Sequence, residues 1–238
     1  MKIFLAGASG AIGRRLTPLL RAAGCDVTGM TRSADAARDL QAACVTPAVA
    51  DVYDPDGLTR AVVAARPDIV MHQLTDLPRV FDETRLAALY PRNARIRTEG
   101  TRNLVAAAKA AGARRFIVQS VAFAYAPGKE PHVEADPLNV ADGPRVVTVR
   151  AAADMEQQVL NSGMEAVVLR YGLFYGPGTW TETPAGKPSL HIDAAAKAAL
   201  LSVTGGAGIY NIADDDGAVS IERARRELGF DPAFRLKV

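Results

Sequence analysis

Short apolar runs alternate along the chain with longer segments in which apolar residues recur every three or four positions. The short runs predict strands at Lys2–Ala6, Asp26–Met30, Val45–Ala50, Asp68–Gln73, Arg115–Ser120, Glu165–Arg170 and Gly208–Ile212. The longer segments predict helices at Ala11–Ala23, Ser33–Ala42, Asp54–Ala65, about Asp82–Gly112 with a break near Pro91, Arg150–Ser162, Asp193–Leu201 and Ser220–Leu228. Apolar strands that alternate with helices are typical of a parallel sheet covered on both faces. The pattern therefore predicts an α/β fold.

The regular pattern loosens in the second half of the chain. Pro127–Pro144 and Tyr171–Pro188 are rich in Gly and Pro and lack periodicity, so we expect long loops there. Residues 1–170 form the predicted sheet domain, and residues 171–238 form a small C-terminal lobe. The helix at 193–201 is expected to pack back on the sheet domain.

Composition and charge narrow the class of protein. The 238 residues carry 28 Lys and Arg against 26 Asp and Glu, a net charge of +2, without the basic excess typical of nucleic-acid binders. No apolar run predicts a membrane span, and the glycine spacing of the first residues argues against a signal peptide. Cys25 and Cys44 alone indicate no disulfide framework. We expect a cytoplasmic protein that binds neither nucleic acid nor membranes.

Three glycines follow the first predicted strand and open the first predicted helix. They lie in the segment Gly7-Ala8-Ser9-Gly10-Ala11-Ile12-Gly13. Glycines at this place let the backbone turn tightly and approach a pyrophosphate, whose charge is attracted by the free N–H groups of the helix N-terminus. The segment predicts a dinucleotide-binding loop, and a plain strand–helix turn is the alternative.

The Gly-x-x-Gly-x-x-Gly spacing resembles that of the short-chain dehydrogenase/reductase superfamily, in its extended branch of NAD(P)-dependent epimerase/dehydratase-like proteins. Four further segments match that branch, at Gly100–Leu104, Leu169–Gly178, His191–Asp193 and Tyr210–Ile212. The resemblance runs from residue 1 to about residue 230. It implies a doubly wound Rossmann-type sheet, a C-terminal lobe that holds a small-molecule substrate, and a homodimer. The implied activity is that of an NAD(P)-dependent oxidoreductase or epimerase/dehydratase-like enzyme.

The end of the second predicted strand indicates which cofactor is bound. NAD-binding folds carry a carboxylate about 20 residues after the glycines, which bonds the adenosine ribose. Here that place reads Met30-Thr31-Arg32-Ser33, and the Arg32 guanidinium matches a 2′-phosphate in charge and shape. A solvated arginine is the alternative reading of Arg32. We therefore expect NADP, with NAD as the other possibility.

The loop and the resemblance together give a set of expected cofactor contacts. Asp51 and Val52 match the pair that contacts adenine in the family, although Asp51 could simply cap its loop. The full set is Gly7, Ser9, Gly10, Ala11, Ile12, Gly13, Thr31, Arg32, Asp51, Val52, Leu74, Thr75, Gln119 and Tyr171. The histidines show no metal-ligand spacing, so no metal site is expected.

The catalytic groups usual in the resembled family are missing. Its hydride-transferring members carry a Ser or Thr and a Tyr-x-x-x-Lys pair, in which the lysine lowers the pKa of the tyrosine. Matching Glu156 to the family's helix glutamate puts Thr148 at the tyrosine position and Ala152 at the lysine position. Val121 falls at the serine position, one residue after Ser120. None of these three residues can perform the family's acid–base step.

Ser120, Tyr125 and Tyr171 are the remaining candidate catalytic residues, each of which could equally be a structural residue with a bonded hydroxyl. The missing pair leaves a second functional hypothesis open, a sensor or regulator that binds NADP without turnover. A basic stretch adds one more observation. It could attract an anionic substrate or form a solvated helix face, and it consists of Arg85, Arg92, Arg95, Arg97 and Arg102.

Overall fold

Seven parallel strands form one twisted sheet in the computed structural model, which describes residues 1–78, 86–143 and 145–236. The strand order is β3-β2-β1-β4-β5-β6-β9. The strands are β1 (Lys2–Ala6), β2 (Asp26–Thr31), β3 (Thr46–Val49), β4 (Ile69–His72), β5 (Arg115–Val121), β6 (Glu165–Tyr171) and β9 (Gly208–Ile212). Two further short strands, β7 (Leu173–Tyr175) and β8 (Ser189–His191), pair with each other outside this sheet. The predicted α/β class and Rossmann-type sheet are confirmed.

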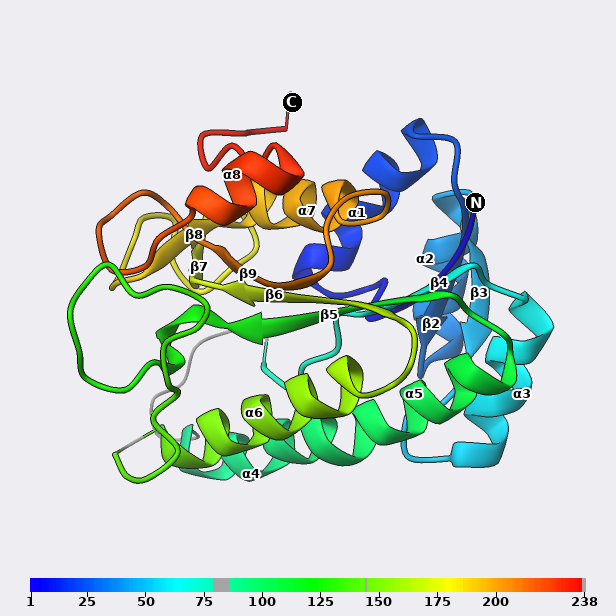
Figure 1. The fold of residues 1–238 in the computed structure, drawn as a ribbon. Coiled ribbons are helices and arrows are strands. Elements are labelled where there is room, and N and C mark those ends of the chain that lie inside the picture. The colour runs from blue at the N-terminus through cyan, green and yellow to red at the C-terminus, as the bar shows by residue number, and fades with distance from the viewer. Residues whose placement is uncertain (79–85, 144, 237–238) are drawn as a thin grey trace.

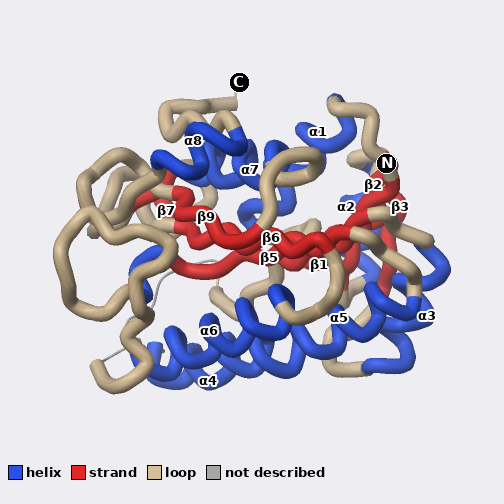
Figure 2. The backbone as a smooth tube through the Cα atoms, viewed as in Figure 1, coloured by secondary structure: helices blue, strands red, loops and turns tan. Residues whose placement is uncertain are grey.

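Helices cover both faces of the sheet (Figures 1 and 2). One face carries α1 (Ala11–Ala22), α7 (Ile192–Leu201) and α8 (Glu222–Leu228). The opposite face carries α3 (Pro55–Ala65), α4 (Leu86–Arg95), α5 (Thr101–Ala110) and α6 (Val146–Leu160). The remaining helix, α2 (Ala34–Ala42), packs against β2 and β3 at the sheet edge.

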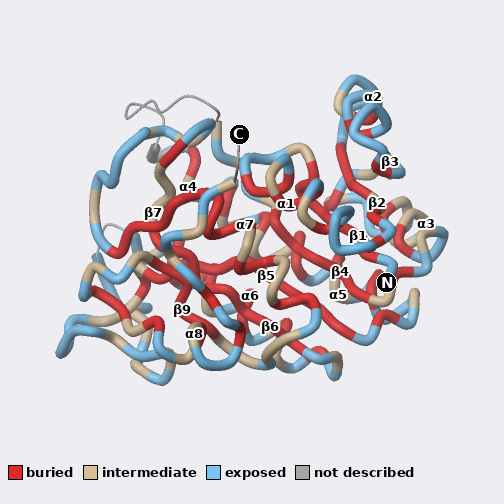
Figure 3. The backbone as a smooth tube through the Cα atoms, turned by 90° about the horizontal axis from the view of Figure 1, so that it is seen from above, coloured by how far each residue is buried: buried red, intermediate tan, exposed pale blue. Residues whose placement is uncertain are grey.

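The period-two alternation of the strands divides the core between the two faces. Ile3 and Leu5 of β1 join the apolar cluster under α1 and α7, whereas Phe4 and Ala6 join the cluster under α3, α5 and α6. Figure 3 shows the buried strands in the centre of the molecule with exposed chain around them. A sheet with two buried faces needs apolar residues at consecutive positions, which is the pattern of the short runs in the sequence.

The predicted helix starts are confirmed where a side chain caps the helix. The Ser33 hydroxyl accepts a hydrogen bond from the N–H of Ala36 at 3.1 Å, at the start of α2. Asp54 accepts from the N–H of Gly57 at 3.0 Å, at the start of α3. Each bond satisfies one of the N–H groups that have no partner within the helix.

The structure differs from the predicted elements at three places. Pro91 lies inside α4 and does not interrupt it, whereas the helix widens five residues later into the π-helical turn η2 (Ile96–Gly100). The start of the predicted helix, Asp82–Arg85, lies outside the described residues. Helix α6 begins at Val146, four residues before the predicted start at Arg150. The predicted loop Tyr171–Pro188 contains β7, which is too short to give a periodic signal.

Residues 171–238 are closely joined to the rest of the fold. Strand β9 extends the sheet beside β6, and α7 packs against α1 on one face. The division at residue 170 into a cofactor domain and a substrate lobe stays a prediction.

The tight packing of the glycine loop predicts the effect of one substitution. A Cβ atom at Gly13 would lie 2.2 Å from the carbonyl oxygen of Gly7, whereas one at Gly10 would lie 3.2 Å from the same atom. We expect Gly13→Ala to destabilise the fold by about 1–3 kcal/mol, because the backbone must move to relieve the overlap. Gly10→Ala is the matched control, and we expect it to lower the free energy of unfolding by less. Urea unfolding of both variants measures the difference, and equal losses would contradict this account of the loop.

Candidate cofactor and substrate site

The glycine loop lies at the carboxyl end of β1, beside the reversal of strand order between β1 and β4. Ligands of doubly wound sheets bind at this place. Gly10 precedes α1 without a side-chain cap, so the first N–H groups of the helix are left for a ligand. These features suit the pyrophosphate of a dinucleotide.

Gln73 lies next to the loop and gives a second sign that a ligand fits here. Its side chain is 5% exposed and lies against the buried Tyr171 hydroxyl, whose pKa is raised by burial and lowered by this contact, and its amide has no further partner among the described residues. Its carbonyl oxygen would lie 2.6 Å from a Cβ at Gly7, so loop and residue are in direct contact. A primary amide offers two donors and an acceptor, so one contact with Tyr171 leaves hydrogen-bonding capacity for a bound ligand. The residues present therefore fit a dinucleotide cofactor.

The ends of β2 and β3 hold the residues expected to meet the adenosine. The Arg32 side chain is exposed and makes no hydrogen bond or ion pair with any described residue. Thr31 is buried beside it. The Asp51 carboxylate accepts from the N–H of Tyr53 at 2.9 Å, so it does cap its own loop, and Val52 is buried in the apolar cluster under α3 and α5.

The remaining expected contacts lie along the same edge of the sheet. The Gln119 amide in β5 donates to the carbonyl of Leu74 at 2.9 Å and ties this strand to the loop after β4. Thr75 follows and is exposed. The structure thus brings the predicted residues after β1, β2, β4 and β5 to one carboxyl edge, and their roles toward the cofactor stay predictions.

An apolar cluster occupies the place expected for the catalytic serine and lysine. Val121 and Ala152 belong to one buried cluster, together with Ala124 and Val149. Thr148, four residues before Ala152, is also buried. The alignment of Glu156 with the family's helix glutamate, and with it the missing acid–base pair, stays a prediction.

Ser120 and Tyr125 belong to a buried polar chain behind this cluster. The Ser120 hydroxyl donates to Glu156 at 2.6 Å, and Arg170 donates to both oxygens of Glu156 at 3.0 and 2.7 Å. Arg170 also donates to the Tyr125 hydroxyl at 2.9 Å, which in turn donates to Asn211 at 2.7 Å. Burial raises the pKa of the Tyr125 hydroxyl, although the charge of Arg170 acts in the opposite sense.

Tyr171 lies on the other face of the sheet. It is 1% exposed, and its hydroxyl donates to the carbonyl of Ala195 in α7 at 3.4 Å. Burial raises the pKa of this hydroxyl well above its ordinary value. The structure therefore does not bring Ser120, Tyr125 and Tyr171 to a common point, and their catalytic roles stay predictions.

His72 ends β4 and is fully buried. Its Nδ1 accepts from the N–H of Leu74 at 3.2 Å, so its Nε2 carries the proton and faces the Thr101 hydroxyl at 3.1 Å. Burial, and then the nearby charge of Arg97, lower the pKa of His72 to about 3. The imidazole therefore stays neutral at physiological pH and serves as a structural link between β4 and α5.

A pocket of about 150 Å³ opens between the end of β5 and the start of α6. Its aromatic wall consists of Phe123 and Tyr125, and Val149 of the apolar cluster lies beside them. The Arg145 guanidinium lies 4.7 Å from the centre of the Phe123 ring. The pocket thus combines apolar walls with polar groups, and Val149 joins it to the apolar cluster of Val121 and Ala152.

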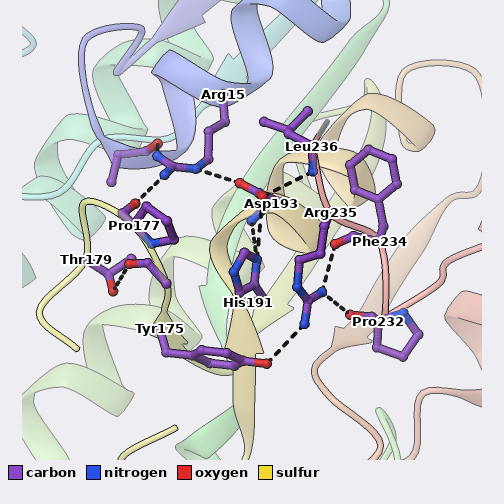
Figure 4. A network of polar contacts seen from close by, with 12 residues as sticks. Arg15, Tyr175, Pro177, Thr179, His191, Asp193, Pro232, Phe234, Arg235 and Leu236 are labelled. Atoms are coloured by element: carbon purple, nitrogen blue, oxygen red, sulfur yellow. Dashed lines mark hydrogen bonds and ion pairs between the residues drawn. The ribbon is translucent and has the colours of Figure 1, made fainter. Parts of the chain in front are cut away.

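A separate set of polar contacts holds the segment Tyr175–Thr179 beside α1 (Figure 4). Arg15 donates to Asp193 at 2.7 Å and to the carbonyl oxygen of Pro177. Asp193 also accepts from the N–H of Leu236 at 3.2 Å. The first turns of α1 and α7, this segment and the C-terminal residues are therefore fastened together next to the glycine loop.

Comparison with known proteins decides the family. A family model described as NAD(P)H-binding matches residues 7–193. The chain belongs to this NAD(P)H-binding family. A curated relative from Streptomyces sp., named 3-diazoavenalumate denitrifying reductase, is 40% identical over 258 residues, covering 98% of this chain and 83% of that protein. The expected NAD(P) cofactor class is thereby confirmed.

Solved structures of two epimerases share the fold of this chain. A UDP-glucose 4-epimerase from Thermotoga maritima superposes with a TM-score of 0.81 at 17% identity, covering 99% of this chain and 94% of that one. A UDP-glucose 4-epimerase from Thermus thermophilus, in complex with NAD, gives 0.73 at 21% identity, covering 98% and 85%. The resemblance inferred from the glycine spacing and the four further segments is confirmed.

Two absences apply to the part of the chain that the structure describes. No helix within it is long and apolar enough to cross a membrane. No group of three His, Cys, Asp or Glu residues within the described ranges is arranged to hold a metal ion.

The buried ion pair of this NAD(P)H-binding protein predicts a stability difference. The side chains of Glu156 and Arg170 are each 4% exposed. Glu156→Gln leaves the Arg170 charge without its counter-charge, so we expect a loss of about 3–5 kcal/mol. Glu165 pairs with buried Arg115 at 3.0 Å but is 68% exposed, so Glu165→Gln should cost less than about 1 kcal/mol. Denaturant unfolding of both variants measures the difference, and similar losses would contradict it.

Proposed function

We propose that the protein is an NADPH-dependent reductase that replaces the diazonium group of a small aromatic acid by hydrogen. The observation that carries this proposal is the apolar cluster of Val121 and Ala152, with Thr148 beside it, at the place of the usual proton-donating set. A reaction that needs no proton from the protein suits such a site. The name of the Streptomyces relative, a denitrifying reductase of a diazo compound, supports the same reaction class.

The bond changes of this reaction balance without a side-chain acid. Bound NADPH supplies a hydride, that is one hydrogen with two electrons. For an arenediazonium cation the carbon–nitrogen bond breaks, N₂ leaves, and a carbon–hydrogen bond forms, so the hydride neutralises the cation. Reduction of a carbonyl group instead leaves an alkoxide, which must take a proton. General acid help is worth roughly 10²–10⁴-fold in rate, and this site lacks it for carbonyl substrates.

The residues of the chain then have binding and shielding roles. Phe123 and Tyr125 line a pocket that suits an aromatic ring, and Val149 keeps water from that side. Ser120, Tyr125 and Tyr171 stay the candidate proton donors for any substrate whose reduction does need a proton. An NADP-binding sensor without turnover is the second candidate function, favoured by the same missing groups.

The reaction test compares two substrate classes on one enzyme. We expect an arenediazonium carboxylate to consume NADPH and release N₂ in a 1:1 ratio, because each N₂ lost requires one hydride. A matched aryl aldehyde acid should be reduced roughly 10²–10⁴-fold more slowly. Absorbance of NADPH and mass spectrometry of N₂ measure both. Equal rates on the two substrates would contradict the proposal, and NADPH binding without consumption of either would favour the sensor.

We propose NADP(H) as the cofactor in preference to NAD(H), because Arg32 is exposed and unpaired among the described residues at the end of β2. Charge-assisted hydrogen bonds to a phosphate contribute about 1.5–3 kcal/mol, which is roughly 10–150-fold in affinity. Arg32→Ala should lose that much NADPH affinity and little NADH affinity. Arg38→Ala is the matched control, since Arg38 is exposed in α2 and pairs with Asp35. Calorimetry decides it, and tighter NADH than NADPH binding by the native protein would contradict the preference.

We also propose that the protein is a cytoplasmic homodimer built on α5 and α6. These helices pack side by side on one face of the sheet and are rich in alanine, which lets partner helices approach closely. Sedimentation at micromolar concentration should give the dimer mass. Placing a charge in the expected interface, with Ala106→Glu on the exposed side of α5, should then give monomers. A monomeric native protein would contradict this assembly.

A further inference from the structure

Arg97 differs from the other described arginines of the basic stretch. Arg92, Arg95 and Arg102 are exposed, and the first two pair with Asp76 and Glu99. Arg97 lies in the π-helical turn η2 and is half-buried against α6. The wide turn shifts the helix face by part of a turn, and π-turns of this kind are frequent at functional sites. Arg85 lies outside the described residues.

The Arg97 guanidinium has few partners for a group with five N–H donors. Among the described residues, its single hydrogen bond runs from Nη1 to the carbonyl oxygen of Thr148 and is long, at 3.5 Å. Glu156 is near enough to act on its charge, but both carboxylate oxygens already accept hydrogen bonds from Arg170. A partly desolvated cation without a close counter-charge is costly to keep in a fold.

The charge of Arg97 persists at neutral pH despite this environment. Burial lowers its pKa to about 10, against the opposing effect of Glu156, so the guanidinium stays protonated at pH 7. A permanently charged group with unused donors and some solvent access is the arrangement that binds an anion.

The position of Arg97 connects it to the candidate site. Its charge acts on His72, which ends β4 at the carboxyl edge of the sheet. Its hydrogen bond reaches Thr148 in the first turn of α6, one residue before Val149 in the wall of the pocket. Ala152, one turn further along α6, is uncharged and packed in the apolar cluster. The nearby cation described here therefore comes from η2.

We propose that Arg97 binds the carboxylate of an aromatic acid substrate. The proposal rests on the proposed function for the aromatic part of the substrate, whereas the unpartnered guanidinium by itself indicates the anion. The planar guanidinium can donate two parallel hydrogen bonds to a carboxylate, which fixes the orientation of the acid as well as binding it. A neutral ester or amide of the same acid accepts weaker bonds and gains no charge interaction.

Binding of cinnamate and of methyl cinnamate, measured by calorimetry with and without saturating NADPH, tests the proposal. We expect cinnamate to bind the native protein roughly tenfold or more tightly than its ester. Arg97→Gln should remove that difference and leave NADPH affinity unchanged, and Arg97→Lys should keep part of it. Arg102→Gln is the matched control, because Arg102 is an exposed arginine on the neighbouring helix. Thermal unfolding confirms that each variant is folded.

Three results would overturn the assignment. Cinnamate and its methyl ester could bind the native protein with equal affinity, or neither could bind, both with and without NADPH. Arg145→Gln, in the pocket wall, could remove the preference while Arg97→Gln keeps it. Arg97→Gln could weaken NADPH and leave cinnamate unaffected, which would assign the guanidinium to the cofactor.

These binding measurements do not require turnover. The carboxylate site at Arg97 and the proposed reaction can therefore be tested independently. A chain that binds cinnamate through Arg97 but releases no N₂ keeps this inference and loses the proposed reaction. A chain that reduces the diazonium acid but binds cinnamate equally well after Arg97→Gln keeps the reaction and loses this inference.

Discussion

Glu156 and Arg170 hold opposite charges almost out of contact with water, between α6 and β6, and the site is built around that pair. Both nitrogens that Arg170 directs at the carboxylate form hydrogen bonds, and Ser120 donates a third. A pair buried this deeply keeps its charges only when such geometry is satisfied, so the register of α6 on the sheet is fixed. Because α6 is fixed, Thr148 and Ala152 must lie beside the end of β5, next to Val121.

The elements that fit the cofactor lie apart from that pair. The glycine loop follows β1, the open N-terminus belongs to α1 and the buried Gln73 amide follows β4, and none of them depends on the side chains at the start of α6. The polar chain through Arg170, Tyr125 and Asn211 links β6 to β9 and to the segment after β5.

The sequence predicted the parts of the molecule that local chemistry controls. Short continuous apolar runs located the strands of the main sheet, and the predicted helix starts at Ser33 and Asp54 coincide with residues that cap α2 and α3. The pair β7–β8 gave no signal, because three-residue strands are too short to show a period. The π-turn was also missed, since Pro91 is the visible irregularity in that segment and η2 contains no proline. Arg97 lies in this turn and is half-buried, unlike the exposed arginines around it. The sequence shows only a run of similar arginines, so it could not predict which of them is buried.

Isotope effects give the most direct test of the claim that reduction at this site needs no proton from the protein. The rate of diazonium reduction is compared for NADPH and for NADPH deuterated at the transferred position, in H₂O and in D₂O. We expect deuterium from the cofactor to slow the reaction and to appear in the aryl product, while D₂O leaves the rate unchanged. A slower rate in D₂O, abolished by Tyr125→Phe or Tyr171→Phe, would show that a side chain supplies a proton and would contradict the account.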